Sequence, residues 1–176
     1  DKQLTASQRR GVIFQSDFMA LEGRKVVEVI KGGDILNHVE PNDFVISMRS
    51  FQGGLEWSAL RGSISSAYVM VVPSELVFPG FFRYLFKSSV YIQALQSTSD
   101  LVRDGQALRF KNFTQVALPL IPMAEQRSIA EFLDSETSRI DLLIEKTEQS
   151  IDLLKEHRSA LITAAVTGKI DIRETA

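Results

Sequence analysis

Residues 43–58, DFVISMRSFQGGLEWS, combine hydrogen-bonding side chains with adjacent glycines in a spacing that could recognise a nucleic acid. An arginine can donate two hydrogen bonds to O6 and N7 of guanine, and a glutamine can pair with N6 and N7 of adenine. Glycines let the backbone approach a phosphate because no β-carbon intervenes. The contact residues predicted in this stretch are Arg49, Ser50, Phe51, Gln52, Gly53 and Gly54. The alternative is a tight turn in which Arg49 forms only a surface ion pair, and the chemistry alone leaves both open.

Other reactive groups are sparse. The chain has no cysteine, which excludes a disulfide framework, a thiolate metal site and a cysteine nucleophile. Its two histidines, His38 and His157, lie far apart, and no phosphate-binding loop, Gly-x-Ser-x-Gly or His-Glu-x-x-His motif is present. We therefore predict no catalytic residue, no metal site and no cofactor. An enzyme with an unrecognised site remains the third alternative, and methyl transfer or nicking by the purified chain would reveal it.

The elements that must position these residues begin with a long C-terminal helix. Residues 124–167 contain neither glycine nor proline, and Gly168 follows as a left-handed stop. At 1.5 Å per residue such a helix is about 65 Å long, so its apolar stripe needs a partner helix. The predicted packing residues are Ile129, Leu133, Ile140, Leu143, Ile144, Ile151, Leu154 and Leu161. Thr147, Ser150 and His157 interrupt the stripe and are interpreted as a wet, register-setting part of the seam.

Upstream of the helix, the chain predicts a mixed domain of short strands with one packed helix. Strands are expected where β-branched and apolar residues alternate, and a helix where apolar residues recur at a period of 3.6. The expected strands are 12–14, 26–30, 43–48 (half-buried), 63–72 and 113–120, with a helical turn at 35–39, turns at 32–34 and 103–106, and a helix at 79–97 whose aromatics form core. The fold class is therefore α+β, with a domain at 1–121 and a helix with a short tail at 122–176.

The two regions differ in net charge. Residues 1–120 carry 13 Lys and Arg against 11 Asp and Glu, a net charge of +2, whereas residues 121–176 carry 7 against 11, a net charge of −4. If the chain binds DNA, the first region does so through a local basic patch. No run approaches the length of about 18 apolar residues that a membrane span needs. We expect a soluble, cytoplasmic protein without a membrane partner.

Several segments resemble the specificity subunits of type I restriction–modification systems. In that family a strand ending in prolines leads into Glu-Gln, an aliphatic residue and Leu-Asp at the start of a long helix. The matching segments, in the family's order, are 43–58, GSISSAY at 62–68, RDGQALRF at 103–110, Phe113, LPLIPMAEQRSIAEFLD at 118–134, RIDLLI at 139–144 and LITAAVTG at 161–168.

The resemblance implies a target recognition domain that reads one half of a split DNA site, joined to a spacer helix. In the family the spacer helices pack antiparallel, and methylation and cleavage come from modification and restriction subunits. The partners implied are double-stranded DNA, modification subunits and, through them, restriction subunits. The chain is expected to be a half-subunit that forms a homodimer, or one half of a longer product pairing with a second recognition half. Arg103 and Lys111 are predicted to contact phosphates. The alternative is a coiled-coil module that binds proteins and no DNA.

Overall fold

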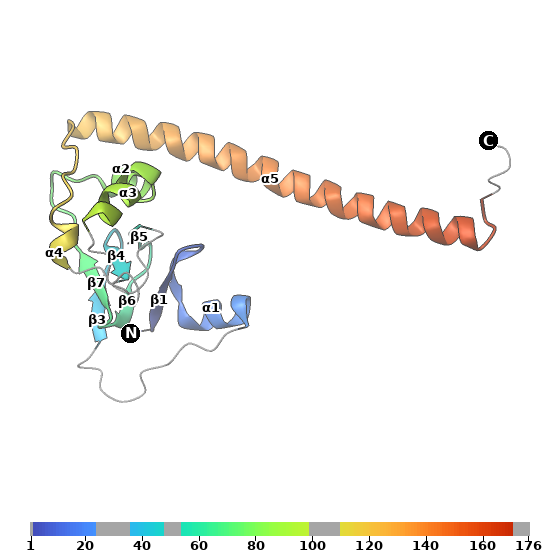
Figure 1. Ribbon diagram of the computed structural model, residues 1–176, viewed down its shortest axis with the longest axis horizontal. Coiled ribbons are helices and arrows are strands. Elements are labelled where there is room, and N and C mark those ends of the chain that lie inside the picture. Colours follow the sequence, from blue (N-terminus) through green and yellow to red (C-terminus); the bar gives the residue numbers. More distant parts are fainter. Residues whose placement is uncertain (1, 24–35, 48–53, 99–109, 171–176) are drawn as a thin grey trace. The chain divides into compact units, whose positions relative to one another are not determined.

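The computed structural model describes residues 2–23, 36–47, 54–98 and 110–170. Along the chain these residues form a mixed α/β unit followed by one long helix, as the sequence predicts (Figure 1). The strands are β1 (Leu4–Ser7), β2 (Gly11–Phe14), β3 (Leu36–Val39), β4 (Phe44–Ser47), β5 (Glu56–Trp57), β6 (Gly62–Ser65) and β7 (Tyr68–Val71). The helices are α1 (Gln15–Glu22), α2 (Pro79–Leu85), α3 (Ser89–Ser97), α4 (Phe110–Phe113) and α5 (Met123–Val166).

Strands β1 and β2 form an antiparallel hairpin in which Ser7 pairs with Gly11. The Arg10 amide donates to the Ser7 carbonyl oxygen at 3.3 Å, and Gly11 adopts a left-handed φ of 69°. A three-residue connection closed by a left-handed glycine is a common hairpin turn. The predicted strand at 12–14 is confirmed. Its partner β1 was not expected, because a three-residue turn at Gln8-Arg9-Arg10 carries a weaker sequence signal than Asn-Gly or Asp-Gly.

Two further sheets complete the strand framework. β3 pairs with β6, and β4 lies between β5 and β7, all antiparallel. The helical turn expected at 35–39 is wrong, because residues 36–39 form β3. The single strand expected at 63–72 is also wrong. A turn at Ser66 and Ala67 divides it, so that β6 and β7 belong to different sheets.

Strand β4 carries core residues on both of its faces. Phe44 and Ile46 belong to one hydrophobic cluster. It also contains Phe82 of α2, Phe86 directly after α2, and Tyr91 and Leu95 of α3. Val45 points into a second cluster with Leu4, Val12, Val39 and Ile64, one from each of β1, β2, β3 and β6. The strand at 43–48 is confirmed, but the expectation that it is half-buried is wrong. Its three apolar residues are at most 1% exposed.

The predicted helix at 79–97 is divided into α2 and α3. The Ser88 hydroxyl accepts a hydrogen bond from the Tyr91 amide and so caps the N-terminus of α3, which makes α3 a separate helix. The expectation that its aromatics form core is confirmed, since Phe86 contacts the rings of Phe44, Phe82 and Tyr91 with centroids 4.9–5.5 Å apart.

Residues 113–120 do not form the predicted strand. Phe113 ends the short helix α4, and residues 117–122 have no regular secondary structure. Phe113 and Val116 instead pack against the aromatic cluster. The predicted strand at 26–30 and the predicted turns at 32–34 and 103–106 lie outside the described residues.

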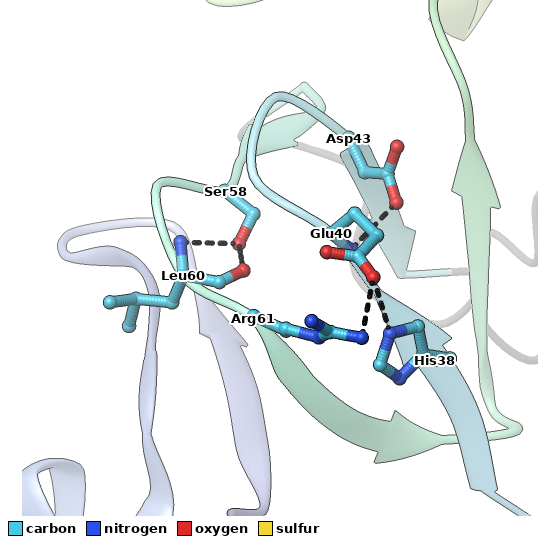
Figure 2. A network of polar contacts seen from close by, with 6 residues as sticks. All are labelled: His38, Glu40, Asp43, Ser58, Leu60 and Arg61. Carbon is cyan, nitrogen blue, oxygen red and sulfur yellow. Dashed lines mark hydrogen bonds and ion pairs between the residues drawn. The ribbon is translucent and has the colours of Figure 1, made fainter. Parts of the chain in front are cut away.

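A polar network holds the turn between β3 and β4 (Figure 2). The Asp43 amide donates to the Glu40 carbonyl oxygen, with Pro41 and a left-handed Asn42 (φ 79°) between them, the pattern of a type II turn. The Asp43 carboxylate accepts from the Glu40 amide at 2.9 Å, while the Glu40 carboxylate lies between His38 and Arg61. The Ser58 amide donates to the Asp43 carbonyl oxygen, so the network fixes the start of β4.

Helix α5 confirms the predicted long helix, with bounds one residue earlier at each end. At its C-terminus the Lys169 amide donates to the Ala164 carbonyl oxygen and Gly168 has a φ of 72°, which is the expected glycine stop. The chain divides into two compact units, Asp1–Ala130 and Glu131–Ala176, so the first two turns of α5 belong to the first unit. Among the described residues, no helix is long and apolar enough to cross a membrane.

Candidate functional site

The predicted recognition loop follows β4 in the sequence. Arg49, Ser50, Phe51, Gln52 and Gly53 lie outside the described residues, and Gly54 lies inside them. Gly54 is buried, has a φ of 76°, and a β-carbon on it would overlap the carbonyl oxygen of Phe86. Gly54 therefore has a packing reason to be glycine. Its predicted contact with DNA stays a prediction.

A hollow of about 350 Å³ opens beside the two ends of this loop. We call it the hairpin hollow, because the turn between β1 and β2 forms one of its walls. It is lined by Ala6, Ser7, Gln8, Arg9, Phe18, Ser47, Gly54, Glu56 and Tyr68. Arg9 is exposed, whereas Ser47 and Tyr68 are half-buried. The hollow therefore brings the hairpin turn, which the sequence did not predict, beside Ser47 and Gly54.

A buried ion pair adjoins the hairpin hollow. Glu56 is 6% exposed, and its Oε1 accepts a hydrogen bond from Nζ of Lys87. Burial raises the pKa of the Glu56 carboxyl, while the hydrogen bond and the charge of Lys87 act against this rise. Oε2 lies 3.9 Å from the point that a β-carbon on Gly11 would occupy, which places the carboxylate close to the hairpin. Because Lys87 balances its charge, Glu56 adds little net negative charge to the hollow.

The two predicted phosphate contacts are described only in part. Lys111 is exposed on α4, where its side chain is available to a ligand. Arg103 lies outside the described residues.

The start of α5 is held by a buried side chain that the sequence reading did not select. Gln126 is fully buried: its Oε1 accepts from the Phe78 amide at 2.8 Å, and its Nε2 donates to the carbonyl oxygens of Leu76 and Ile121 at 3.0 and 2.9 Å. The neighbouring Arg127 guanidinium lies 4.5 Å from the Phe78 ring centre. The only sequence signal was the Glu-Gln pair that entered through the family resemblance.

The predicted packing face of α5 is largely open to solvent in the isolated chain. Ile129 and Leu133 are partly covered, whereas the predicted residues from Ile140 onward are each 46–66% exposed. Further exposed apolar residues on the helix are Phe132, Leu142, Leu153, Ile162 and Val166. The exposed apolar residues thus extend along most of the length of α5.

Among the described residues, no group of three or more His, Asp or Glu side chains could hold a metal ion. The Glu40 carboxylate contacts His38 and Arg61, and both contacts are at the surface. Such exposed pairs contribute little to stability and form no enclosed site.

Sequence comparison gives relatives of one kind. No protein-family model matches the chain. The chain is 30% identical over 138 residues to the type I restriction enzyme EcoKI specificity subunit of Escherichia coli strain K12, covering 75% of this chain and 30% of that protein. It is 27% identical over 141 residues to the type I restriction enzyme StySPI specificity subunit of Salmonella potsdam, with the same coverages. The EcoBI specificity subunit of Escherichia coli is 35% identical over 80 residues, 46% of this chain and 17% of that protein.

Proposed function

Because this chain is a homologue of type I restriction enzyme specificity subunits, we propose that it supplies DNA sequence recognition to a restriction–modification complex. The similarity over about three-quarters of the chain carries this proposal. The chain spans about 30% of the length of the first two relatives, so the role concerns one recognition unit and its helix. In this proposal residues 1–121 read one half of a split DNA site, and α5 is the spacer.

The proposed contacts to bases come from the segment at the end of β4, with Arg49 and Gln52 as the principal readers. The anchoring of β4 supports this proposal. Strand β4, which precedes this segment, is anchored on both faces, and the network around Asp43 fixes its start. Base reading needs such rigidity because bidentate hydrogen bonds depend on the position of both partners. Arg103 and Lys111 are proposed to bind phosphates.

The proposed partner of α5 is a second helix running antiparallel, from a second copy of the chain or a second recognition half. Each Leu or Ile that becomes fully buried contributes roughly 1.5–3 kcal/mol, so the exposed residues from Ile140 to Leu161 favour association. A two-fold axis between two identical copies would present two identical recognition units to a palindromic split site.

The chain itself is proposed to be non-catalytic, with methyl transfer and cleavage carried out by modification and restriction subunits. The experiment that tests the whole proposal is co-purification with the modification subunit of its system, followed by mapping of methylated positions in genomic DNA. We expect the complex to methylate one split sequence and the pure chain to methylate none. Methyl transfer from S-adenosylmethionine, or nicking, by the pure chain would contradict the proposal.

A second candidate function follows from the exposed face of α5, which suits a coiled-coil module that binds only proteins. The two candidates differ in their response to salt. Binding to DNA phosphates weakens steeply as salt rises, because condensed cations are released on binding. A chain that associates through α5 but shows no salt-dependent binding to duplex DNA would favour the coiled-coil module.

A further inference from the structure

The turn between β1 and β2 places one arginine in the hairpin hollow with little freedom in the backbone. The pairing of Ser7 with Gly11, the hydrogen bond from the Arg10 amide to Ser7 and the left-handed Gly11 together define the path of this turn. Arg9 sits within it and is exposed. The hairpin also rests on the core, since Leu4 and Val12 belong to a buried cluster. Arg9 is thus a flexible side chain on a fixed support.

The two neighbouring arginines of the turn have different surroundings. Nε of Arg10 donates a hydrogen bond to the Glu22 carboxylate of α1 at 2.9 Å, so Arg10 is already part of an ion pair. Within the described residues, no hydrogen bond or ion pair joins the Arg9 side chain to another group. Arg9 lines the hairpin hollow, and Arg10 does not. A guanidinium carries five N–H donors, and those of Arg9 are not engaged within the described residues, so they suit an acceptor from outside the chain.

The other walls of the hollow agree with a nucleic-acid ligand. Ser47 and Gly54 are the described residues on either side of the predicted recognition loop, and both line the hollow. The carboxylate of Glu56 is already paired with Lys87, so it does not cancel the charge of Arg9. A two-stranded ribbon is one of the two elements that fit the DNA major groove. The β1–β2 hairpin is therefore an element of a kind that the major groove accommodates.

We propose that the β1–β2 turn is a second DNA-reading element and that Arg9, at the hairpin hollow, hydrogen bonds to a guanine in the major groove. This inference rests on the proposed function, because it assigns a further reader to the same recognition unit. It differs from the predictions for Arg49 and Gln52, since it concerns a segment about 40 residues earlier in the chain. An arginine fork to O6 and N7 of guanine supplies both affinity and base identity.

The test uses the full chain in complex with its modification subunit and a random-sequence duplex DNA library. Sequences selected by the unaltered complex define the preferred site, and the affinity of each variant is then measured on that site and on its single-base variants. We expect Arg9→Ala to weaken binding about 5- to 150-fold on the preferred site and to lose preference at one G·C pair. Arg9→Lys should also lose that preference, because a lysine keeps the charge without the planar fork.

Arg10→Ala is the matched control, since it removes the neighbouring arginine that is paired with Glu22. It should leave the selected sequence unchanged, and thermal unfolding should show that both variants fold. Equal weakening of every sequence by Arg9→Ala would overturn the reading role. Binding unchanged by Arg9→Ala would overturn the DNA contact itself. If the unaltered complex selects no sequence, the proposed function has failed. That result differs from one in which the complex selects a sequence but Arg9→Ala leaves its binding unchanged.

Discussion

The side chain of Gln126 accepts a hydrogen bond from the backbone amide of Phe78 at 2.8 Å, across 48 residues of sequence. With the Leu76 and Ile121 carbonyl oxygens as its other partners, Gln126 joins the start of α5 to two separate segments of the first unit. All three partners are backbone groups, so the link does not depend on which side chains these segments carry.

We predict that Gln126→Leu destabilises the protein strongly. Leucine fills a similar volume but leaves one amide and two carbonyl groups without their partner, at a cost of roughly 1–3 kcal/mol for each buried group. The midpoint of urea unfolding measures this loss. Gln149→Leu is the control, because Gln149 is exposed on the same helix and should change stability by less than about 0.5 kcal/mol. Equal midpoints for the two variants would show that the buried hydrogen bonds contribute nothing.

Gly54→Ala and Gly23→Ala separate backbone strain from lack of space. Both glycines have left-handed φ values, 76° and 63°, and alanine should lose about 1–2 kcal/mol at either for this reason. A β-carbon on Gly23 meets nothing within 4 Å, whereas one on Gly54 overlaps the Phe86 carbonyl oxygen. We therefore expect Gly54→Ala to lose considerably more stability in thermal unfolding. A smaller loss at Gly54 than at Gly23 would contradict this packing.

The buried carboxyl of Glu56 predicts a pH dependence of stability. Its pKa in the folded protein lies above the ordinary value of 4.5, mainly because of burial. Between these two values the folded protein retains a proton that the unfolded chain has released, so stability falls as the pH rises through that window. Relative to Glu56→Gln, the unaltered protein should lose stability as the pH rises from 4.5. Urea midpoints at a series of pH values measure this difference.

The control for that series is Glu75→Gln, since Glu75 is exposed in a segment without regular structure. It should keep the pH dependence of the unaltered protein. A difference between the unaltered protein and Glu56→Gln that grows in favour of the unaltered protein as the pH rises would have the wrong sign. Such a result would mean that Lys87 stabilises the carboxylate more than burial penalises it.

The proposed pairing of α5 predicts that Ile140→Asp combined with Leu154→Asp gives a monomer with a frayed helix. Two charges placed in an apolar seam cost more than the association can supply. Light scattering measures the mass, and circular dichroism measures the helix content. Leu142→Asp with Leu153→Asp is the matched control, because at about 100° per residue these leucines lie on the opposite side of the helix. A helical monomer of the unaltered chain at micromolar concentration would refute a homodimer.

Arg49→Ala and Lys111→Ala should affect DNA binding differently. Losing a bidentate base contact should cost about 1–3 kcal/mol and relax specificity at one base pair. Losing a phosphate contact should weaken all sequences alike and reduce the slope of log affinity against log salt by about one. Titrations of the assembled complex at several salt concentrations distinguish the two. An unchanged methylated sequence and affinity for Arg49→Ala would remove Arg49 as a reader.

Some elements can be predicted from their own residues, whereas others depend on contacts with distant parts of the chain. Helix α5 follows from its own residues, because a 3.6 period without glycine or proline specifies a helix and Gly168 specifies its end. The depth of β4 did not follow, since Val45 becomes buried only when β1, β2, β3 and β6 assemble around it. The division of residues 79–97 into α2 and α3 was missed, because the apolar residues keep their helical spacing across the serine cap at Ser88.

The candidate site shows the same division. The sequence singled out residues rich in donors, such as Arg49, but Arg9 in a short polar turn resembled any surface arginine. Its place beside Ser47 and Gly54 depends on the hairpin, which pairs residues that sequence reading treated as a loop. Gln126 was missed for a related reason, because its partners are backbone groups of distant segments and leave no pattern in the sequence.

The burial of β4 on both faces has a consequence for how such a protein can change over generations. Phe44, Val45 and Ile46 touch two separate clusters, so almost any replacement there would cost stability. The side chains of the β1–β2 turn are exposed, and most surface replacements alter stability little. Selection could therefore exchange Gln8 or Arg9 for new residues while the strand beneath stays constant. The molecule separates the positions that preserve its fold from positions at which a new DNA preference could arise.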